Sequence, residues 1–235
     1  MTAQKHNEEN IHMKDRPYPS IRDILKRDPE VNLEKINQDQ FFNVGRGICG
    51  GMSTVHVTKV LEQNNVKNPF RNREAYEKSA EIQTRCQQSD RQDECFAYTI
   101  AKEYPTANRK MMSEMIFGKA DDHYARGYKI ISDVNDLKTE LKKTIRDTQN
   151  DGHARGSLIS MNIHRTPNGK ENSGGHMLSM TSQINKDVLE CTGIESNLFF
   201  ASGKGKAACD KIAEKLVDTA RAYDAYDLRI NISKR

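Results

Sequence analysis

Residues 41–63 read FFNVGRGICGGMSTVHVTKVLEQ, and four of the seven positions from 45 to 51 are glycine. The first cysteine of the chain, Cys49, lies in this glycine-rich run, and apolar residues at helical spacing follow it. This pattern predicts a helix from about residue 49 to about residue 64, with Cys49 at its N-terminus.

A cysteine at a helix N-terminus can serve as a nucleophile, because unpaired N–H groups and the helix dipole lower the pKa of its thiol. We expect the glycines around Cys49 to let backbone and substrate approach closely. The alternative is a small buried cysteine in a glycine turn, and the choice depends on whether the chain also supplies a base.

The composition indicates a protein with a modest core and a large polar surface. The chain has 235 residues, of which 30% are charged and 35% hydrophobic. We predict a flexible arm over residues 1–19 and a single domain over residues 20–235. No apolar run reaches the roughly 18 residues of a membrane helix, and the N-terminus has no apolar stretch typical of a signal peptide. We therefore expect no membrane span, and a location that is cytoplasmic or reached without a signal peptide.

The cysteines and charges exclude several other classes of protein. Five widely spaced cysteines, an odd number, predict free thiols in a reducing compartment. The net charge of +4 comes from interleaved acids and bases, which argues against a nucleic-acid-binding surface. A metal site is a further alternative, built from His153, His164, His176 and Cys191. These four residues follow no known ligand spacing, so we predict neither a metal nor a cofactor.

Hydrophobic spacing predicts an α+β domain, with helices first and strands second. Ser20 is expected to cap a short helix, a helix or turn to cover about residues 32–39, and helices to dominate residues 69–149. The pattern changes at Gly156, where short alternating runs predict an antiparallel meander, followed by a final helix and strand. The expected helical part therefore spans about residues 20–150, and the sheet part about residues 156–235.

His176, in SGGHMLSM, is the predicted base for Cys49. It opens a predicted strand, and alternation places it on the same face as Leu178 and Met180, at the rim of a core. The alternative is a half-buried histidine with a structural hydrogen bond. His56, seven residues after Cys49, is expected to be a packing residue.

An acid that orients the imidazole is expected on the next strand, and we select Glu190 in VLECTG. If the intervening turn is centred on Gln183, His176 and Glu190 lie directly opposite each other on one face. A turn centred later would shift the partner to Glu195 or Asn197.

An oxyanion would need hydrogen-bond donors close to Cys49. Asn43, six residues before the cysteine, could place its amide beside the Cys49 backbone N–H. Gln40 is the alternative donor.

These residues resemble the arrangement of papain-like cysteine peptidases: an amide side chain ahead of a glycine-flanked cysteine, then a distant histidine and an acid on successive strands. Within that clan, GICGGMSTVH and GGHMLSM are similar to motifs of the YopT/AvrPphB-type effector proteases of pathogenic bacteria. VLECTGIESNLFFAS is similar to a third motif of that family, with Glu190 in place of its aspartate. The resemblance covers about residues 40–63 and 156–203.

The resemblance implies a papain-like fold, with the nucleophile at a helix N-terminus packed on a C-terminal antiparallel sheet. It also implies a thiol hydrolase with a triad of Cys49, His176 and Glu190, and with Asn43 at the oxyanion. The implied substrate is a host protein, reached by signal-peptide-independent secretion into the host cytosol, and a secretion chaperone is a further partner. A glutamine deamidase of the same fold and a non-catalytic helical effector that binds a host protein are the alternatives.

Overall fold

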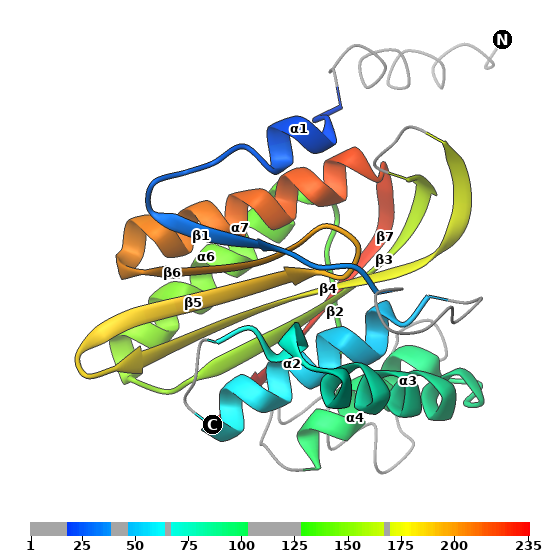
Figure 1. Ribbon diagram of the computed structural model, residues 1–235, viewed down its shortest axis with the longest axis horizontal. Helices are drawn as coiled ribbons and strands as arrows, with labels where there is room; N and C mark the ends of the chain where they lie inside the picture. Colours follow the sequence, from blue (N-terminus) through cyan, green and yellow to red (C-terminus); the bar gives the residue numbers. More distant parts are fainter. Residues whose placement is uncertain (1–17, 39–46, 64–66, 103–127, 167–169) are drawn as a thin grey trace, which may run out of the picture.

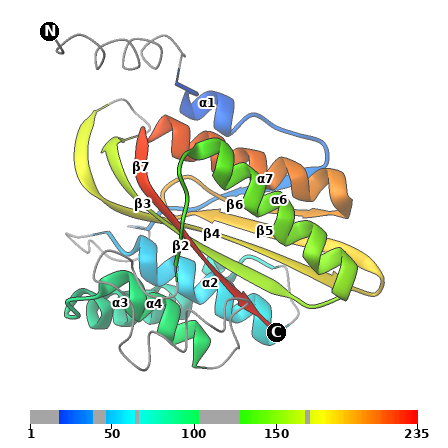
Figure 2. The ribbon, with the colours of Figure 1, turned by 180° about the vertical axis from the view of Figure 1, so that it is seen from behind.

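The computed structural model describes residues 18–38, 47–63, 67–102, 128–166 and 170–235. Within these ranges the chain forms one seven-stranded antiparallel sheet with helices on both faces (Figure 1; Figure 2). The strands are β1 (Val31–Lys35), β2 (Lys129–Ile130), β3 (Arg155–Arg165), β4 (Glu171–Asn185), β5 (Val188–Glu195), β6 (Phe199–Lys204) and β7 (Ala225–Lys234). The helices are α1 (Ile21–Ile24), α2 (Cys49–Gln63), η1 (Pro69–Arg71), α3 (Arg73–Gln87), α4 (Gln92–Ala101), α6 (Val134–Asp151) and α7 (Gly205–Ala222).

The predicted combination of helices with an antiparallel sheet is confirmed. Strands β3 to β6 form a meander, and β7 pairs with β3, in the sheet order β1-β6-β5-β4-β3-β7-β2. Ser20 caps α1 through a capping box with Asp23, as its position before the apolar run predicts.

The N-terminal part is not only helical, which corrects the expected division of the domain. The helix or turn expected over about residues 32–39 is wrong at its start, because Val31–Lys35 is strand β1 and pairs with β6. The two-residue strand β2 pairs with β7 in the same way. β1 and β2 are the two edge strands of the sheet, so each pairs with one neighbouring strand only. That neighbour lies about a hundred or more residues away in the sequence, so no local pattern reveals the pairing.

The β4–β5 hairpin turns at Lys186 and Asp187, both with positive φ (48° and 63°), as a two-residue turn requires. In the resulting register, Gln183 lies opposite Glu190 and Ser179 lies opposite Ile194. The turn assumed from the sequence was centred about three residues too early, so the expected pairing of His176 with Glu190 is wrong.

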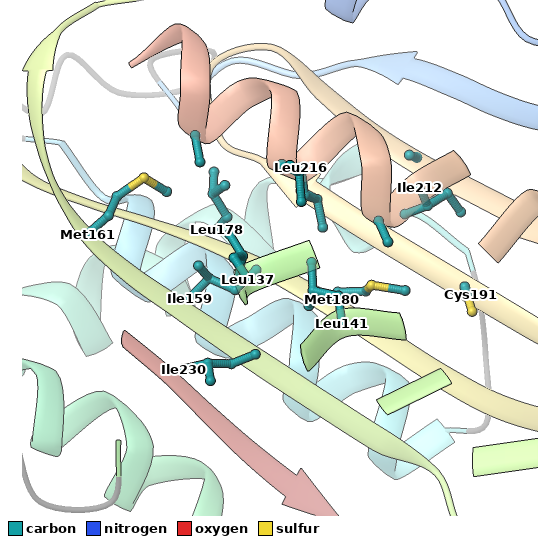
Figure 3. Packing of buried hydrophobic residues seen from close by; sticks show 14 of the residues in the cluster. Leu137, Leu141, Ile159, Met161, Leu178, Met180, Cys191, Ile212, Leu216 and Ile230 are labelled. Carbon is teal, nitrogen blue, oxygen red and sulfur yellow. The ribbon is translucent and has the colours of Figure 1, made fainter. Parts of the chain in front are cut away.

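Two hydrophobic cores lie on the two faces of the sheet. Helices α6 and α7 cover one face, where Leu137 and Leu216 pack against Leu178 and Met180 of β4 (Figure 3). Helices α2, α3 and α4 cover the other face, where Met177 and Ile194 belong to the second core (Figure 1). Adjacent residues Met177 and Leu178 thus enter different cores, as alternation along a strand predicts.

Helix α2 lies between the sheet and the α3–α4 pair, and its glycines permit this packing. A Cβ atom on Gly51 would lie 1.9 Å from the backbone oxygen of Ser79 on α3. A Cβ atom on Gly50 would lie 2.4 Å from the ring of Phe96 on α4. These two glycines therefore allow neighbouring helices to approach α2 closely, as expected for the backbone, while close approach of a substrate stays a prediction.

His56 lies inside the core between α2 and the sheet and is fully buried. Its Nδ1 atom is 2.8 Å from the Ser179 hydroxyl, and its Nε2 atom is 2.7 Å from the Thr192 hydroxyl. Burial lowers the pKa of His56 to about 3, so the ring is neutral at physiological pH. His56 is thus a packing residue, as predicted, and its two hydrogen bonds join the helix to the sheet.

The expectation of five free thiols is wrong. A disulfide joins Cys86 of α3 to Cys95 of α4, and a second joins Cys191 of β5 to Cys209 of α7. All five cysteines lie in the described residues, and Cys49 alone is unbonded. The sequence separations of 9 and 18 residues do not reveal these bonds, because helix packing brings the pairs together.

Within the described ranges, the helices are too short or too polar to cross a membrane.

Candidate active site

Cys49 is the first residue of α2, and its partly exposed side chain interacts with His176 of β4. A hydrogen bond links the thiol to the imidazole, and a second links the sulfur to the backbone N–H of Met177. The two residues are 127 positions apart in the sequence, so only the packing of α2 on β4 brings them together.

The imidazole of His176 is hydrogen-bonded to Glu195 at the end of β5. The Nε2 atom of His176 lies 2.8 Å from Oε1 of Glu195, and both side chains are buried. Because Nε2 is engaged by the carboxylate, Nδ1 is the ring nitrogen left for Cys49. The three side chains therefore form one continuous hydrogen-bonded relay.

The strand register explains why Glu195 rather than Glu190 contacts the imidazole. Ser179 faces Ile194, so residue 176 falls opposite residue 197, and Glu195 is its diagonal neighbour on the same face. Glu190 lies on the opposite face of β5, where it pairs with Lys204 at 2.7 Å. The alternative acid raised by the sequence, Glu195, is thus the one beside His176.

Glu195 is held by two further hydrogen bonds. The hydroxyl of Tyr223, at the end of α7, donates to Oε1 at 2.9 Å, and the backbone N–H of Asn197 donates to Oε2 at 2.9 Å. The Tyr223 ring also lies against the imidazole, with ring centroids 4.7 Å apart. Sequence reasoning did not identify Tyr223, because nothing in RAYDAY connects it with a strand thirty residues earlier.

Electrostatics at this site favour a thiolate–imidazolium pair. Burial opposes charge on Cys49, but His176 and the Met177 N–H outweigh it and lower the pKa of the thiol. Burial alone would lower the pKa of His176, whereas Cys49 and Glu195 raise it to about 10. Each member of the pair thus stabilises the charged form of the other.

Two glutamines hold backbone N–H groups at the start of α2. Oε1 of Gln38 accepts from the Ile48 N–H at 2.9 Å, and Oε1 of Gln83 accepts from the Gly51 N–H at 2.9 Å. Helix geometry leaves the Cys49 N–H between them without an acceptor within α2. Asn43 and Gln40, the oxyanion donors suggested by the sequence, lie outside the described residues.

Two cavities meet at Cys49 and His176. The first, of about 250 Å³, lies against α3 and α4, with Gln83, Asp93 and Phe96 in its wall. The second, of about 380 Å³, lies on the other side of the thiol, with Gln38, Leu198 and Tyr223 in its wall. Since both cavities include Cys49 and His176, the surface is hollowed on either side of the thiol.

The four residues of the metal alternative have separate partners. Cys191 is in a disulfide, His176 contacts Glu195, and His164 stacks on Tyr226. His153 lies 3.0 Å from the backbone oxygen of Arg235. Among the described residues, no group of three histidines, cysteines or carboxylates has an arrangement that could hold a metal ion.

Comparison with known proteins yields one distant structural similarity. No protein-family model and no curated protein matches the chain. The crystal structure of the Pseudomonas avirulence protein AvrPphB is 14% identical, covering 85% of this chain and 94% of that chain, with a TM-score of 0.43. A similarity at this level carries no conclusion about activity.

Proposed function

We propose that this protein is a thiol hydrolase, a cysteine protease in which Cys49, His176 and Glu195 act together. The observation that carries the proposal is the relay from the thiol through the imidazole to a buried carboxylate. A nucleophile, a base and a group that orients the base are what nucleophilic catalysis at a carbonyl requires.

The proposed reaction begins with attack of the Cys49 thiolate on a carbonyl carbon. The carbonyl oxygen becomes negative and accepts hydrogen bonds from the Cys49 N–H and from a side-chain amide. His176, protonated at Nδ1, gives this proton to the leaving amine, and an acyl-thioester remains on Cys49. His176 then takes a proton from water, which attacks the thioester, and the thiolate is restored.

Gln38 is our candidate for the side-chain donor at the oxyanion. Its Oε1 atom is held by the Ile48 N–H, which fixes the amide plane, and Gln38 shares a cavity wall with Cys49. The remaining NH₂ group is then available as a donor. Asn43 stays a prediction of the sequence.

The cavities on both sides of Cys49 favour an extended polypeptide substrate. A chain that crosses the thiol would place residues in both cavities and a peptide bond over the sulfur. This is the reason for proposing a protease ahead of a glutamine deamidase.

The motif resemblance extends the proposal to a papain-like fold and to a host protein as substrate, reached by secretion into a host cell. These extensions rest on residues 47–53 and on the Gly-His run before Met177, and the relay by itself does not require them.

Two measurements test the proposal. Iodoacetamide should alkylate Cys49 rapidly well below pH 8, and His176→Ala should return the reactivity to that of an ordinary thiol. Host-cell lysate treated with wild type should contain new peptide termini that are missing after treatment with Cys49→Ala.

The other outcomes are also informative. A mass gain of about one unit at a glutamine or asparagine would indicate the deamidase, because amide nitrogen is replaced by oxygen. A Cys49→Ala protein that keeps full cellular activity would support the non-catalytic binding module and would falsify the hydrolase proposal.

A further inference from the structure

We infer that the cavity between Cys49 and the α3–α4 pair is a recognition pocket for a basic substrate side chain, arginine or lysine, with Asp93 as the determinant. This inference rests on the proposed function, because it concerns the substrate of the same site. We call this cavity the α3–α4 pocket, with walls that include Gln83, Gln87, Gln92, Asp93, Phe96 and Ser160.

The size of the α3–α4 pocket suits one side chain. Its volume of about 250 Å³ is below the roughly 300–1,000 Å³ of pockets that hold a whole small molecule. Cys49 and His176 form part of its wall, so a residue bound there would lie next to the reacting carbonyl.

The charges of the α3–α4 pocket favour a cation. Among the described residues that line it, the charged groups are the Cys49–His176 pair, which is neutral overall, and the carboxylate of Asp93. An acidic side chain would be repelled by Asp93, and an apolar one would remove from water a carboxylate whose partner Arg229 lies 3.5 Å away and offsets its charge only in part. A guanidinium or ammonium group would offset its charge.

Asp93 is positioned for this function by its neighbours. Its Oδ2 atom accepts from the Ser160 hydroxyl at 2.7 Å and lies 3.5 Å from Arg229, which does not line the pocket. Both contacts involve Oδ2, so Oδ1 can accept a hydrogen bond from a substrate side chain in the pocket.

The other walls complement a long basic side chain. Gln83 is 4% exposed, and because its Oε1 is held by Gly51, its orientation is fixed. Gln87 and Gln92 add amide oxygens that can accept from N–H groups. The ring of Phe96 offers an aromatic surface, on which a guanidinium or an alkyl stem packs favourably.

Protection of Cys49 from iodoacetamide tests this inference. N-acetylarginine amide, which can fill the α3–α4 pocket, should slow alkylation of Cys49 in wild type. N-acetylcitrulline amide has nearly the same shape without the charge, and should protect less. The ratio of the two inhibition constants should be roughly 2 to 5, as for a partly exposed charge pair.

Variants assign the effect to Asp93. Asp93→Asn should remove the preference for arginine over citrulline, while Glu94→Gln should keep it. Glu94 is next to Asp93 on α4 but does not line the pocket, so its variant removes the same charge nearby. Protection is expressed relative to the alkylation rate of each variant without competitor, which corrects for changes in thiol reactivity.

Several results would overturn the inference: equal protection by arginine and citrulline amides, better protection by leucine amide, or a preference for arginine that survives Asp93→Asn. The wild-type comparison stands alone if Asp93→Asn does not fold. Slow, unselective alkylation of Cys49 would count against the proposed function instead. The protection ratios can still be read in that case, because they need only a measurable rate.

Discussion

His176 and Glu195 form a 2.8 Å hydrogen bond across two neighbouring strands, although 19 residues separate them in the sequence. The pair is diagonal in the sheet, because the β4–β5 turn lies at Lys186 and Asp187. Glu195 also accepts from Tyr223 and from the Asn197 N–H, so the carboxylate that faces the imidazole is fixed from three directions.

Replacing Glu195 should impair catalysis, whereas replacing Glu190 should not. Glu195→Gln keeps the shape but loses the charge that stabilises the imidazolium, so we expect kcat to fall roughly 10- to 100-fold. Glu190→Gln is the matched control, since Glu190 pairs with Lys204 on the other face. Equal losses in both variants, measured on a cleaved substrate, would count against the assignment of Glu195.

Gln38 should stabilise the oxyanion. Gln38→Glu keeps an oxygen that can accept from the Ile48 N–H, but it replaces the NH₂ donor with a negative charge. We expect kcat to fall about 100-fold or more, with a much smaller change in KM. If Gln38→Glu leaves kcat intact while Asn43→Ala lowers it, the donor is Asn43, as the sequence suggested.

Tyr223 should act as a positioning residue through Glu195. Tyr223→Phe keeps the ring against His176 but removes the hydroxyl that donates to Oε1 of Glu195, the oxygen that also contacts His176. The freed carboxylate should hold the imidazolium more strongly and raise the pKa of His176 further, which moves the alkaline limb of the pH–activity profile to higher pH. We expect kcat at neutral pH to fall about two- to fivefold, the equivalent of one hydrogen bond.

The control for Tyr223 is Tyr226→Phe, whose ring stacks on His164 instead. A purely structural function for Tyr223 would lower the unfolding temperature of Tyr223→Phe and leave the pH profile unchanged. That result would exclude the positioning function.

His56 should make the protein sensitive to acid. An unfolded histidine has a pKa of about 6.5, whereas burial holds the folded value at about 3. The unfolded state therefore binds a proton first, and stability falls as the pH drops from about 6.5 toward 3. Once the pH is below both pKa values, this difference lowers the free energy of unfolding by about 4–5 kcal/mol.

Urea unfolding at several pH values measures this effect. His56→Gln retains a donor and an acceptor for Ser179 and Thr192 but does not titrate, so its stability should depend less on pH in this range. His153→Gln, at an exposed site, is the control and should behave as wild type. An unchanged slope in His56→Gln would show that other groups cause the acid sensitivity.

Gly51 should be intolerant of any side chain. Gly51→Ala would place Cβ 1.9 Å from the Ser79 backbone oxygen, so α2 and α3 must separate. We expect a loss of about 1–3 kcal/mol or more in the free energy of unfolding. Gly174→Ala is the control, because a Cβ there meets no atom within 4 Å. Equal stability of the two variants in urea would show that the helices can adjust.

Local pattern was sufficient to predict the helix that begins at Cys49, the meander that carries His176, and the helix and strand that follow the meander. These features depend on the spacing of apolar residues and on glycine-rich turns, which the chain displays over short distances. His56 as a packing residue followed from the same spacing. The short strand β1 was missed, since five residues paired to a distant edge leave little periodic signal.

The acid, the disulfides and the pocket walls depended on tertiary structure. A shift of a few residues in one turn moves a different carboxylate beside His176, because side chains alternate between the two faces of a strand. Cys86 and Cys95 come together when α3 packs against α4, and Gln83 and Asp93 reach one pocket wall beside Cys49 when this pair packs on α2. The sequence by itself therefore determined the Cys49 helix, the meander strands and the nucleophile–base candidates. Long-range packing decided the edge strands and which side chains surround the site, since contacts between distant segments leave no local pattern.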